Sequence, residues 1–105
     1  MPAAKPGEVW MVDLGMIAKV RPCAVLTPLP RGNDLDVFTL VAHTTATRGT
    51  RWEVFLPKPF LDPDGVFDVQ RIATVASVKL ERKLGELKPE EFDKILNALA
   101  DRFGL

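Results

Sequence analysis

The sequence predicts a small α+β domain in which several short antiparallel strands precede one amphipathic helix. Short apolar runs, interrupted by turn residues, follow one another up to residue 78. The links between these runs are too short for the helices that connect parallel strands. After residue 88 apolar residues recur instead at helical spacing. A strongly bent, barrel-like antiparallel sheet with the helix packed on one side satisfies all three observations.

Length and charge set further bounds. The chain has 105 residues, enough for one domain with a compact core. Its 14 Lys and Arg balance its 14 Asp and Glu, so any nucleic-acid binding has to use a local patch. There is no apolar run long enough to span a membrane and no apolar signal core near the N-terminus. We expect a cytoplasmic protein, with residues 1–6 as a flexible leader and residues 7–105 as a single domain.

The first strand is expected over residues 8–14, which are apolar on both faces and so should be covered on both sides or belong to a closed barrel. A short connection that carries Lys19 follows Gly15. Pro22 lacks an N–H and should stand at the first position of the next strand or on an edge, so we place the second strand at residues 23–26. Cys23 lies in this apolar run, which indicates a small core residue; a reactive thiol is the alternative.

The third strand is expected over residues 36–42, after a turn-rich loop at residues 27–34. Residues 43–50 are polar and indicate a loop. Residues 51–56 alternate in polarity, which is typical of a half-buried strand. After a strong turn signal at residues 62–65, the segment 66–78 predicts two further strands or one bent strand.

The pattern changes at Leu80. Residues 81–87 indicate a short helical turn, and Pro89 suits the first position of a helix that ends near Gly104. One side of this helix is apolar, which indicates core packing rather than a groove for a partner. The apolar stripe consists of Phe92, Ile95, Leu96, Leu99 and Phe103.

Several kinds of site find no support in the sequence. One histidine and one cysteine give no zinc-binding spacing, and there is no glycine-rich phosphate loop. The carboxylates at positions 34 and 36, and at 62 and 64, lie among prolines and glycines, where solvated turn carboxylates are common. We therefore expect neither a metal site nor a cofactor, and any catalysis would be metal-free.

The residues that remain for chemistry lie near the second and third strands. Arg21 is a permanently charged fork suited to phosphate oxygens, and the Thr44 hydroxyl can donate to the same oxygens. Together they could stabilise the transition state of phosphodiester cleavage. A surface arginine and an ordinary strand threonine are the alternative. His43 could transfer protons, but strand alternation places it opposite Thr44, and a packed or surface histidine is the simpler interpretation.

Several segments resemble the MazF/PemK family of toxin endoribonucleases. Residues 7–14 (GEVWMVDL) look like the family's opening strand, and residues 21–26 (RPCAVL) resemble its Arg-Pro-x-apolar strand. Residues 41–45 (VAHTT) are similar to its strand that ends in a threonine, and residues 84–87, followed by a helix, fit as well. The resemblance covers residues 7–105, and the order and spacing of the segments carry it rather than any single motif.

The resemblance implies a homodimeric SH3-like barrel that cleaves single-stranded RNA such as mRNA without a metal, with a cognate antitoxin protein as partner. The family's arginine and threonine, which act on the scissile phosphate, map to Arg21 and Thr44. The ribose 2′-hydroxyl attacks and leaves a cyclic phosphate and a 5′-hydroxyl. A catalytically silent SH3-like barrel that binds nucleic acid or protein is the alternative. Further RNA contacts are expected from Lys19, His43, Thr45, Arg48, Gln70 and Arg71.

The sequence departs from the family pattern in three respects. The connection at residues 15–20 is shorter than the loop that in the family often covers the site and meets the antitoxin. The family's late Gln-x-Arg stands here as residues 70–74 (QRIAT), so that either Gln70 or Arg71 takes the glutamine's place. Zero net charge requires the basic groups to converge on one groove. Those groups are Lys19, Arg21, Arg48, Arg51 and Arg71.

Overall fold

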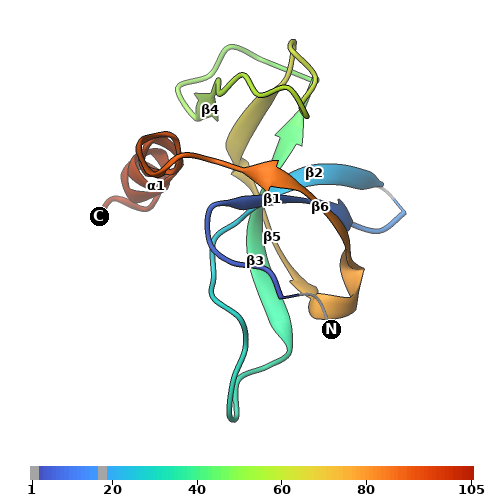
Figure 1. Ribbon diagram of the computed structural model, residues 1–105. Coiled ribbons are helices and arrows are strands. Elements are labelled where there is room, and N and C mark those ends of the chain that lie inside the picture. Colours follow the sequence, from blue (N-terminus) through green and yellow to red (C-terminus); the bar gives the residue numbers. More distant parts are fainter. Residues whose placement is uncertain (1–2, 17–18) are drawn as a thin grey trace.

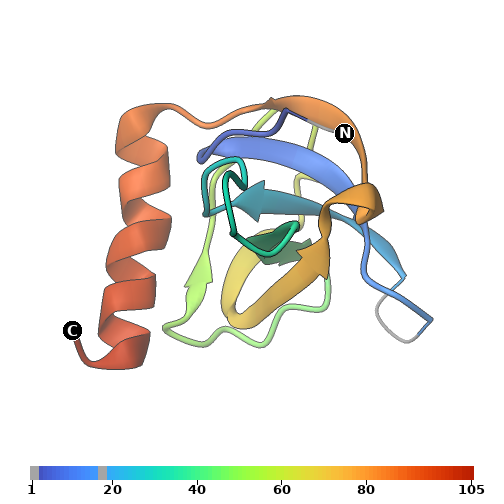
Figure 2. The same ribbon diagram turned by 90° about the horizontal axis from the view of Figure 1, so that it is seen from below.

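The computed structural model describes residues 3–16 and 19–105. Six strands form one antiparallel sheet in the order β4-β5-β3-β2-β1-β6, and one helix, α1, follows them in the sequence. The sheet is strongly curved, and α1 stands at one side of it (Figures 1 and 2). The predicted α+β class is confirmed. In the described residues the sheet ends in two edges, β4 and β6, so its closure into a barrel stays a prediction.

The first two strands lie where the apolar runs predict, with one correction. Strand β1 is Glu8–Asp13, whereas β2 is Val20–Val25 and begins earlier than expected, with Pro22 as its third residue. Pro22 pairs with Met11 of β1, but β3 pairs with β2 only from Cys23 onward. Pro22 thus has a partner strand on one side only, which is an edge position that proline tolerates.

Strand β3 (Val37–Thr44) extends two residues further than predicted, so the expected loop at 43–50 is wrong at its start. His43 and Thr44 are held in the strand because they pair with Phe67 and Val66 of β5. Strand β5 (Val66–Ala76) is the single bent strand of the two alternatives, and a short 3-10 turn follows it. Strand β4 covers only Glu53–Val54 of the strand expected over residues 51–56.

The helical turn expected at residues 81–87 is wrong, because this segment forms strand β6 (Leu80–Glu86) on the free edge of β1. The leucines at positions 80, 84 and 87 have the spacing of one helix face. The segment forms a strand instead, because the backbone N–H and C=O groups on the free edge of β1 bond to it. Packing explains why residue 85 of β6 is a glycine. The Phe60 ring occupies the place of the Cβ that any other residue would carry there.

Helix α1 (Pro89–Phe103) begins and ends where predicted, and Gly104 closes it in the left-handed conformation with φ of 70°. Ile95 is fully buried, as a core residue should be. Leu96 and Phe103 are 40% and 64% exposed, so the predicted core packing holds for only part of the apolar stripe.

The sheet carries a core on each face, because neighbouring residues of a strand point to opposite sides. Ala24 and Val41 belong to the core that α1 covers, which we call the helix-side core. Cys23 and Ala42 belong to the core on the other face, which we call the distal core. Ala4 packs into the distal core with 1% exposure, so the packed chain begins before residue 7.

Residues 1 and 2 of the expected leader lie outside the described residues. Within the described residues, no helix is both long enough and apolar enough to cross a membrane.

Candidate functional site

A cavity of about 240 Å³ opens on the distal-core face, where β2 and β3 part. The β2–β3 pairing ends at Cys23 and Ala42, and Arg21 stands two residues beyond that point. The separation of the two strands therefore leaves room beside the Arg21 side chain. The cavity is lined by Leu14, Arg21, Ala42, Arg71, Ile72 and Ala73.

Arg71 of strand β5 lies at this cavity, beside an irregularity in the pairing of β5 with β3. Five residue steps on β5, from Phe67 to Ile72, face only two steps on β3, from His43 to Val41. Such a bulge bends a strand and redirects its side chains. Arg71 lies in this segment and lines the cavity, whereas its neighbour Gln70 does not, although both residues are exposed. Of the two residues that the sequence left open, the structure brings Arg71 to Arg21.

The electrostatics of the cavity favour an anion. Arg21 and Arg71 are the charged residues among the described ones that line it. The Nε of Arg71 lies 3.4 Å from Oδ2 of Asp68, while Oδ1 of Asp68 accepts a hydrogen bond from the Gln70 backbone N–H at 2.9 Å. Asp68 is thereby held on its own strand and orients the Arg71 guanidinium. Two such forks at one cavity suit the oxygens of a phosphate.

Thr44 is the last residue of β3 and is 1% exposed. Its Oγ1 accepts a hydrogen bond from the Ala46 backbone N–H at 3.1 Å. Thr44 does not line the cavity. Continuing the β2–β3 register two residues past the Cys23–Ala42 pair would nevertheless set Thr44 opposite Arg21, on the same face of the sheet.

His43 points to the other face and is packed there with 4% exposure. Its ring meets the Phe67 ring edge-on, with centroids 5.0 Å apart and an interplanar angle of 72°. The backbone of Gly65 lies directly against the imidazole. Burial lowers the pKa of His43, and the negative charge of Asp62 only partly opposes this. The structure thus gives His43 a packing role and does not bring it to the cavity.

The other predicted contact residues are exposed and lie outside the cavity lining. Lys19, with φ of 60°, closes the connection after β1, where its N–H donates to the Gly15 carbonyl oxygen at 2.7 Å. Thr45 follows β3 directly, and the Arg48 backbone N–H donates to the Glu53 carboxylate at 2.7 Å. Residues 17 and 18 of the short connection lie outside the described residues.

The expected convergence of five basic groups is therefore not seen. Arg21 and Arg71 meet at the cavity, whereas the Arg51 guanidinium lies over the Trp52 ring, 4.3 Å from its centroid. Cation and indole attract each other in this arrangement. Arg51 thus belongs to a different surface.

Cys23, Asp34 and Asp62 behave as the simpler interpretations predict, whereas Asp36 accepts a hydrogen bond from the hydroxyl of the buried, distant Ser77. Cys23 is fully buried, and burial raises its pKa to about 12, so the reactive-thiol alternative is wrong. Asp34 and Asp62 accept hydrogen bonds from backbone N–H groups within their own turns. No group of three or more His, Cys, Asp or Glu side chains is placed to hold a metal ion in the described part of the chain.

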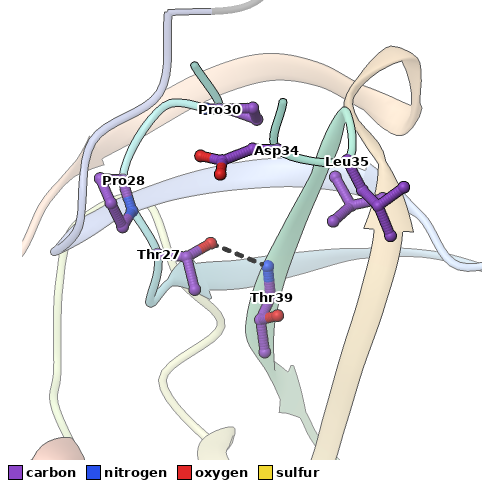
Figure 3. A pocket seen from close by; sticks show the side chains of 7 residues that line it. Thr27, Pro28, Pro30, Asp34, Leu35 and Thr39 are labelled. Atoms are coloured by element: carbon purple, nitrogen blue, oxygen red, sulfur yellow. Dashed lines mark hydrogen bonds between the residues drawn. The ribbon is translucent and has the colours of Figure 1, made fainter. Parts of the chain in front are cut away.

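A second cavity, of about 320 Å³, lies beside the loop between β2 and β3 (Figure 3). Thr27 and Thr39 are linked across it by a 3.1 Å hydrogen bond from the Thr39 backbone N–H to the Thr27 hydroxyl oxygen. Asp34 is the charged residue among its described lining residues, and a carboxylate repels phosphate. None of these lining residues is a predicted site residue. The cavity of Arg21 and Arg71 is therefore the better candidate for a polyanionic ligand.

Comparisons with known proteins identify the family of the chain. Residues 5–103 match the sequence model of the PemK-like, MazF-like toxins of type II toxin–antitoxin systems. An endoribonuclease from a mycobacterial species is 28% identical with a TM-score of 0.78, over 100% of this chain and 95% of that one. An endoribonuclease in complex with its cognate antitoxin, also mycobacterial, is 28% identical with a TM-score of 0.81, over 98% and 97%.

A third solved structure, MazF from Deinococcus radiodurans, shares the fold. It is 16% identical with a TM-score of 0.81, and the match covers 100% of both chains. A search of curated proteins finds no match.

Proposed function

The chain belongs to the PemK-like, MazF-like toxins of type II toxin–antitoxin systems, and we propose that it is an endoribonuclease whose cleavage centre is the cavity of Arg21 and Arg71. The observation that carries this proposal is one cavity that is lined by two arginines from separate strands. Two of the similar structures, each 28% identical over nearly the whole chain, are endoribonucleases. The proposed substrate is single-stranded RNA, including mRNA.

The proposed reaction is a transesterification within the RNA. The ribose 2′-oxygen attacks the adjacent phosphorus and loses its proton, while the bond from phosphorus to the 5′-oxygen breaks and that oxygen gains a proton. The products are a 2′,3′-cyclic phosphate and a 5′-hydroxyl. Arg21 and Arg71 would stabilise the negative charge that develops on the non-bridging oxygens. We assign Arg21 the role of acid or charge stabiliser.

Thr44 is the second proposed catalytic residue, in a positioning role. Its Oγ1 already accepts the Ala46 N–H, which leaves the hydroxyl proton for donation to a phosphate oxygen. Because Thr44 is 1% exposed, RNA would reach its hydroxyl only if the residues that cover it moved aside. The exposed Thr45 and Arg48 on the loop after β3 are the proposed secondary RNA contacts, together with Lys19 and Gln70 beside the cavity-forming strands.

Metal independence is part of the proposal. The cavity offers two cations and no carboxylate among its described lining residues, a set that suits phosphate directly and repels a divalent ion. Two arginines supply the charge that a metal provides in other nucleases.

The proposed partners follow from the family and the neighbours. A mycobacterial structural neighbour is seen with its cognate antitoxin, and we propose that this chain likewise pairs with a cognate antitoxin protein. We also propose a homodimer, and the cytoplasm, where mRNA is available, as the place of action. The strong curvature of the sheet and the two register shifts between β1 and β6 support an SH3-like barrel as the finer description of the fold.

The deciding experiment incubates the purified full-length protein with a long RNA in EDTA and analyses the new ends. We expect 2′,3′-cyclic phosphate and 5′-hydroxyl ends from the wild type and none from Arg21→Ala. Thr44→Val keeps the shape of the side chain but removes the hydroxyl, and should slow cleavage while the fold stays intact. Binding of RNA without any cleavage by the wild type would favour the catalytically silent barrel instead.

A further inference from the structure

Two carboxylates stand directly opposite each other on neighbouring strands. Glu53 of β4 pairs with Asp68 of β5, and we call these two residues the carboxylate pair. Directly opposed residues of antiparallel strands carry their side chains on the same face. Phe67 and Val69, on either side of Asp68, are buried in the helix-side core. Because side chains alternate along a strand, the carboxylate pair belongs to the other face, on which the cavity opens.

Stability alone gives no reason for two acidic residues at these positions. Like charges directly opposite each other destabilise a sheet. Asp68 is only 6% exposed, so water screens its charge little. Among the described residues, no salt bridge includes Glu53, and the salt bridge of Asp68 joins it to Arg71. Departures from a local rule of this kind are expected at functional sites, so the groups that the two carboxylates bind are informative.

Asp68 binds one edge of the arginine that lines the cavity. Its Oδ2 lies 3.4 Å from Nε of Arg71, and its Oδ1 accepts the Gln70 backbone N–H at 2.9 Å. A carboxylate at Nε leaves terminal nitrogens of the guanidinium for a second anion. The Arg71 side chain is 40% exposed, and a long exposed side chain samples many rotamers unless a partner fixes it. Asp68 is that partner.

Glu53 binds the loop that follows β3. Its Oε2 accepts the Arg48 backbone N–H at 2.7 Å, and its Oε1 accepts the Gly49 backbone N–H at 3.0 Å. Nearer to β3, Oγ1 of Thr44 accepts the Ala46 backbone N–H at 3.1 Å. Hydrogen bonds to a carboxylate are stronger than those between neutral groups, so Glu53 is the firmer of the two anchors. The loop is thus fixed close to the residue whose exposed side chain is a proposed RNA contact.

We propose that Glu53 and Asp68 are positioning residues of the proposed cleavage centre, and this inference rests on the proposed function. Asp68 holds the Arg71 guanidinium towards the scissile phosphate. Glu53 holds the loop that carries Arg48 towards the adjoining part of the RNA. Neither carboxylate lines the cavity, so each acts through the group that it binds.

Positioning and plain electrostatics predict effects of opposite sign. RNA is a polyanion, so removal of a negative charge near the cavity strengthens RNA binding if that charge acts only through its field. Removal of a positioning residue has the reverse effect, because a cation is released from its productive place. The sign of the change in cleavage therefore separates the two roles.

The test compares steady-state cleavage of one labelled RNA by the wild type, Asp68→Asn and Glu53→Gln. The asparagine oxygen can still accept the Gln70 N–H, so Asp68→Asn removes the ion pair and keeps the backbone bond. Glu53→Ala is added because a glutamine keeps one of the two acceptors. Urea unfolding confirms that each variant is folded.

Asp62→Asn is the matched control. Oδ1 of Asp62 accepts the Asp64 backbone N–H at 2.9 Å, which is the bond that Asp68 makes to Gln70, but no salt bridge among the described residues includes Asp62. Its kcat and KM should stay close to those of the wild type.

We expect Asp68→Asn to lower kcat about 10- to 100-fold with a smaller change in KM, since misplacement of a group at the reacting centre can cost ~100-fold. In an Arg71→Ala background the same substitution should have little further effect. Glu53→Gln should raise KM with kcat nearly unchanged, and Glu53→Ala should raise it further. The proposal is overturned if the variants cleave RNA as well as or better than the wild type, or if Asp68→Asn costs as much without Arg71 as with it.

Hydrogen exchange in the free protein separates this proposal from the proposed function. By NMR without RNA, the backbone N–H groups of Arg48 and Gly49 should exchange faster in Glu53→Gln than in the wild type. The Nε–H of Arg71 should exchange faster in Asp68→Asn. A wild type that cleaves no RNA would refute the proposed function, whereas unchanged exchange in both variants would refute the positioning roles whether or not RNA is cleaved.

Discussion

Arg21 and Arg71, which come from strands β2 and β5, line one cavity beside the point where the β2–β3 pairing ends. Neither strand by itself creates this arrangement. The β2–β3 pairing ends before Arg21, which leaves space beside that residue. Arg71 lies in the irregular segment of β5 and lines the same space.

Arg71→Ala should reduce RNA cleavage about 10- to 100-fold, because a charge-assisted contact to phosphate is worth ~1.5–3 kcal/mol. Gln70→Ala is the matched control, since Gln70 is exposed and does not line the cavity. Single-turnover cleavage of one labelled RNA compares the two variants. An equal loss in both, or a loss in Gln70→Ala alone, would remove Arg71 from the proposed centre.

Glu8→Gln should lower the free energy of unfolding by about 1–3 kcal/mol. The Glu8 side chain is largely buried and accepts hydrogen bonds at 3.0 Å from the Lys5 backbone N–H and the Trp10 indole, and an ion pair at 3.0 Å from Lys83. Urea unfolding measures the change. Glu81→Gln, on the exposed part of β6, is the control and should be close to neutral.

The contribution of Glu8 should also depend on pH. Burial opposes its ionisation, but the hydrogen bonds from Trp10, Lys83 and Lys5 outweigh burial and lower its pKa below the ordinary value of 4.5. A carboxylate with a lowered folded pKa stabilises the fold above 4.5 and loses that contribution as the pH falls through the folded pKa. The stability difference between wild type and Glu8→Gln should therefore shrink in acid; a constant difference would contradict it.

His43 should make the fold less stable below neutral pH. Burial lowers its folded pKa from the ordinary value of 6.5, so the unfolded chain binds the proton more readily. Stability is then full above 6.5 and decreases as the pH falls towards the folded pKa. Unfolding in urea at neutral and mildly acidic pH measures this slope. His43→Gln should flatten it, and an unchanged slope in that variant would assign the effect to other groups.

Gly65→Ala should destabilise the fold by about 1–3 kcal/mol, since the new Cβ would overlap the buried His43 ring. The ring cannot yield easily because it also packs on Phe67. The test is a double-mutant cycle, in which Gly65→Ala costs less in a His43→Ala background than in the wild type. Equal costs in both backgrounds would show that the backbone, and not the imidazole, resists the change.

The Cys23 thiol should be inert in the folded protein. It is fully buried with its pKa raised to about 12, so almost no thiolate is present at neutral pH. A disulfide reagent such as dithiobisnitrobenzoate should react only as the chain unfolds, at the rate of unfolding in denaturant. Rapid reaction of the native protein would contradict the packing seen here.

The sequence predicts most elements because their signals are local. Alternation and turn residues locate β1 and most of β3, and Pro89 and Gly104 mark the ends of α1 within one residue. The errors fall where pairing overrides a local pattern. Strand β6 resembles a helical turn until β1 supplies its partner, and His43 and Thr44 look like a loop until β5 pairs with them.

The choice of Arg21 follows from residue chemistry and from the resemblance of short segments. The choice between Gln70 and Arg71 did not follow from either, because one residue of register decides which side chain faces the cavity. The irregular pairing of β5 with β3 is a property of the assembled sheet, and the residues near position 70 contain no local pattern that predicts it.

By itself, the amino-acid sequence determined the class of the fold, the order of most of its elements and the chemistry available at Arg21, because hydrophobic period, turn residues and side-chain charge are local features of the sequence. The tertiary structure alone decided that Arg71 joins Arg21, that His43 is packed away from them, and that Arg51 meets Arg102 on Trp52. These are relations between distant segments, and they depend on where strands stop pairing and on which face a bend presents.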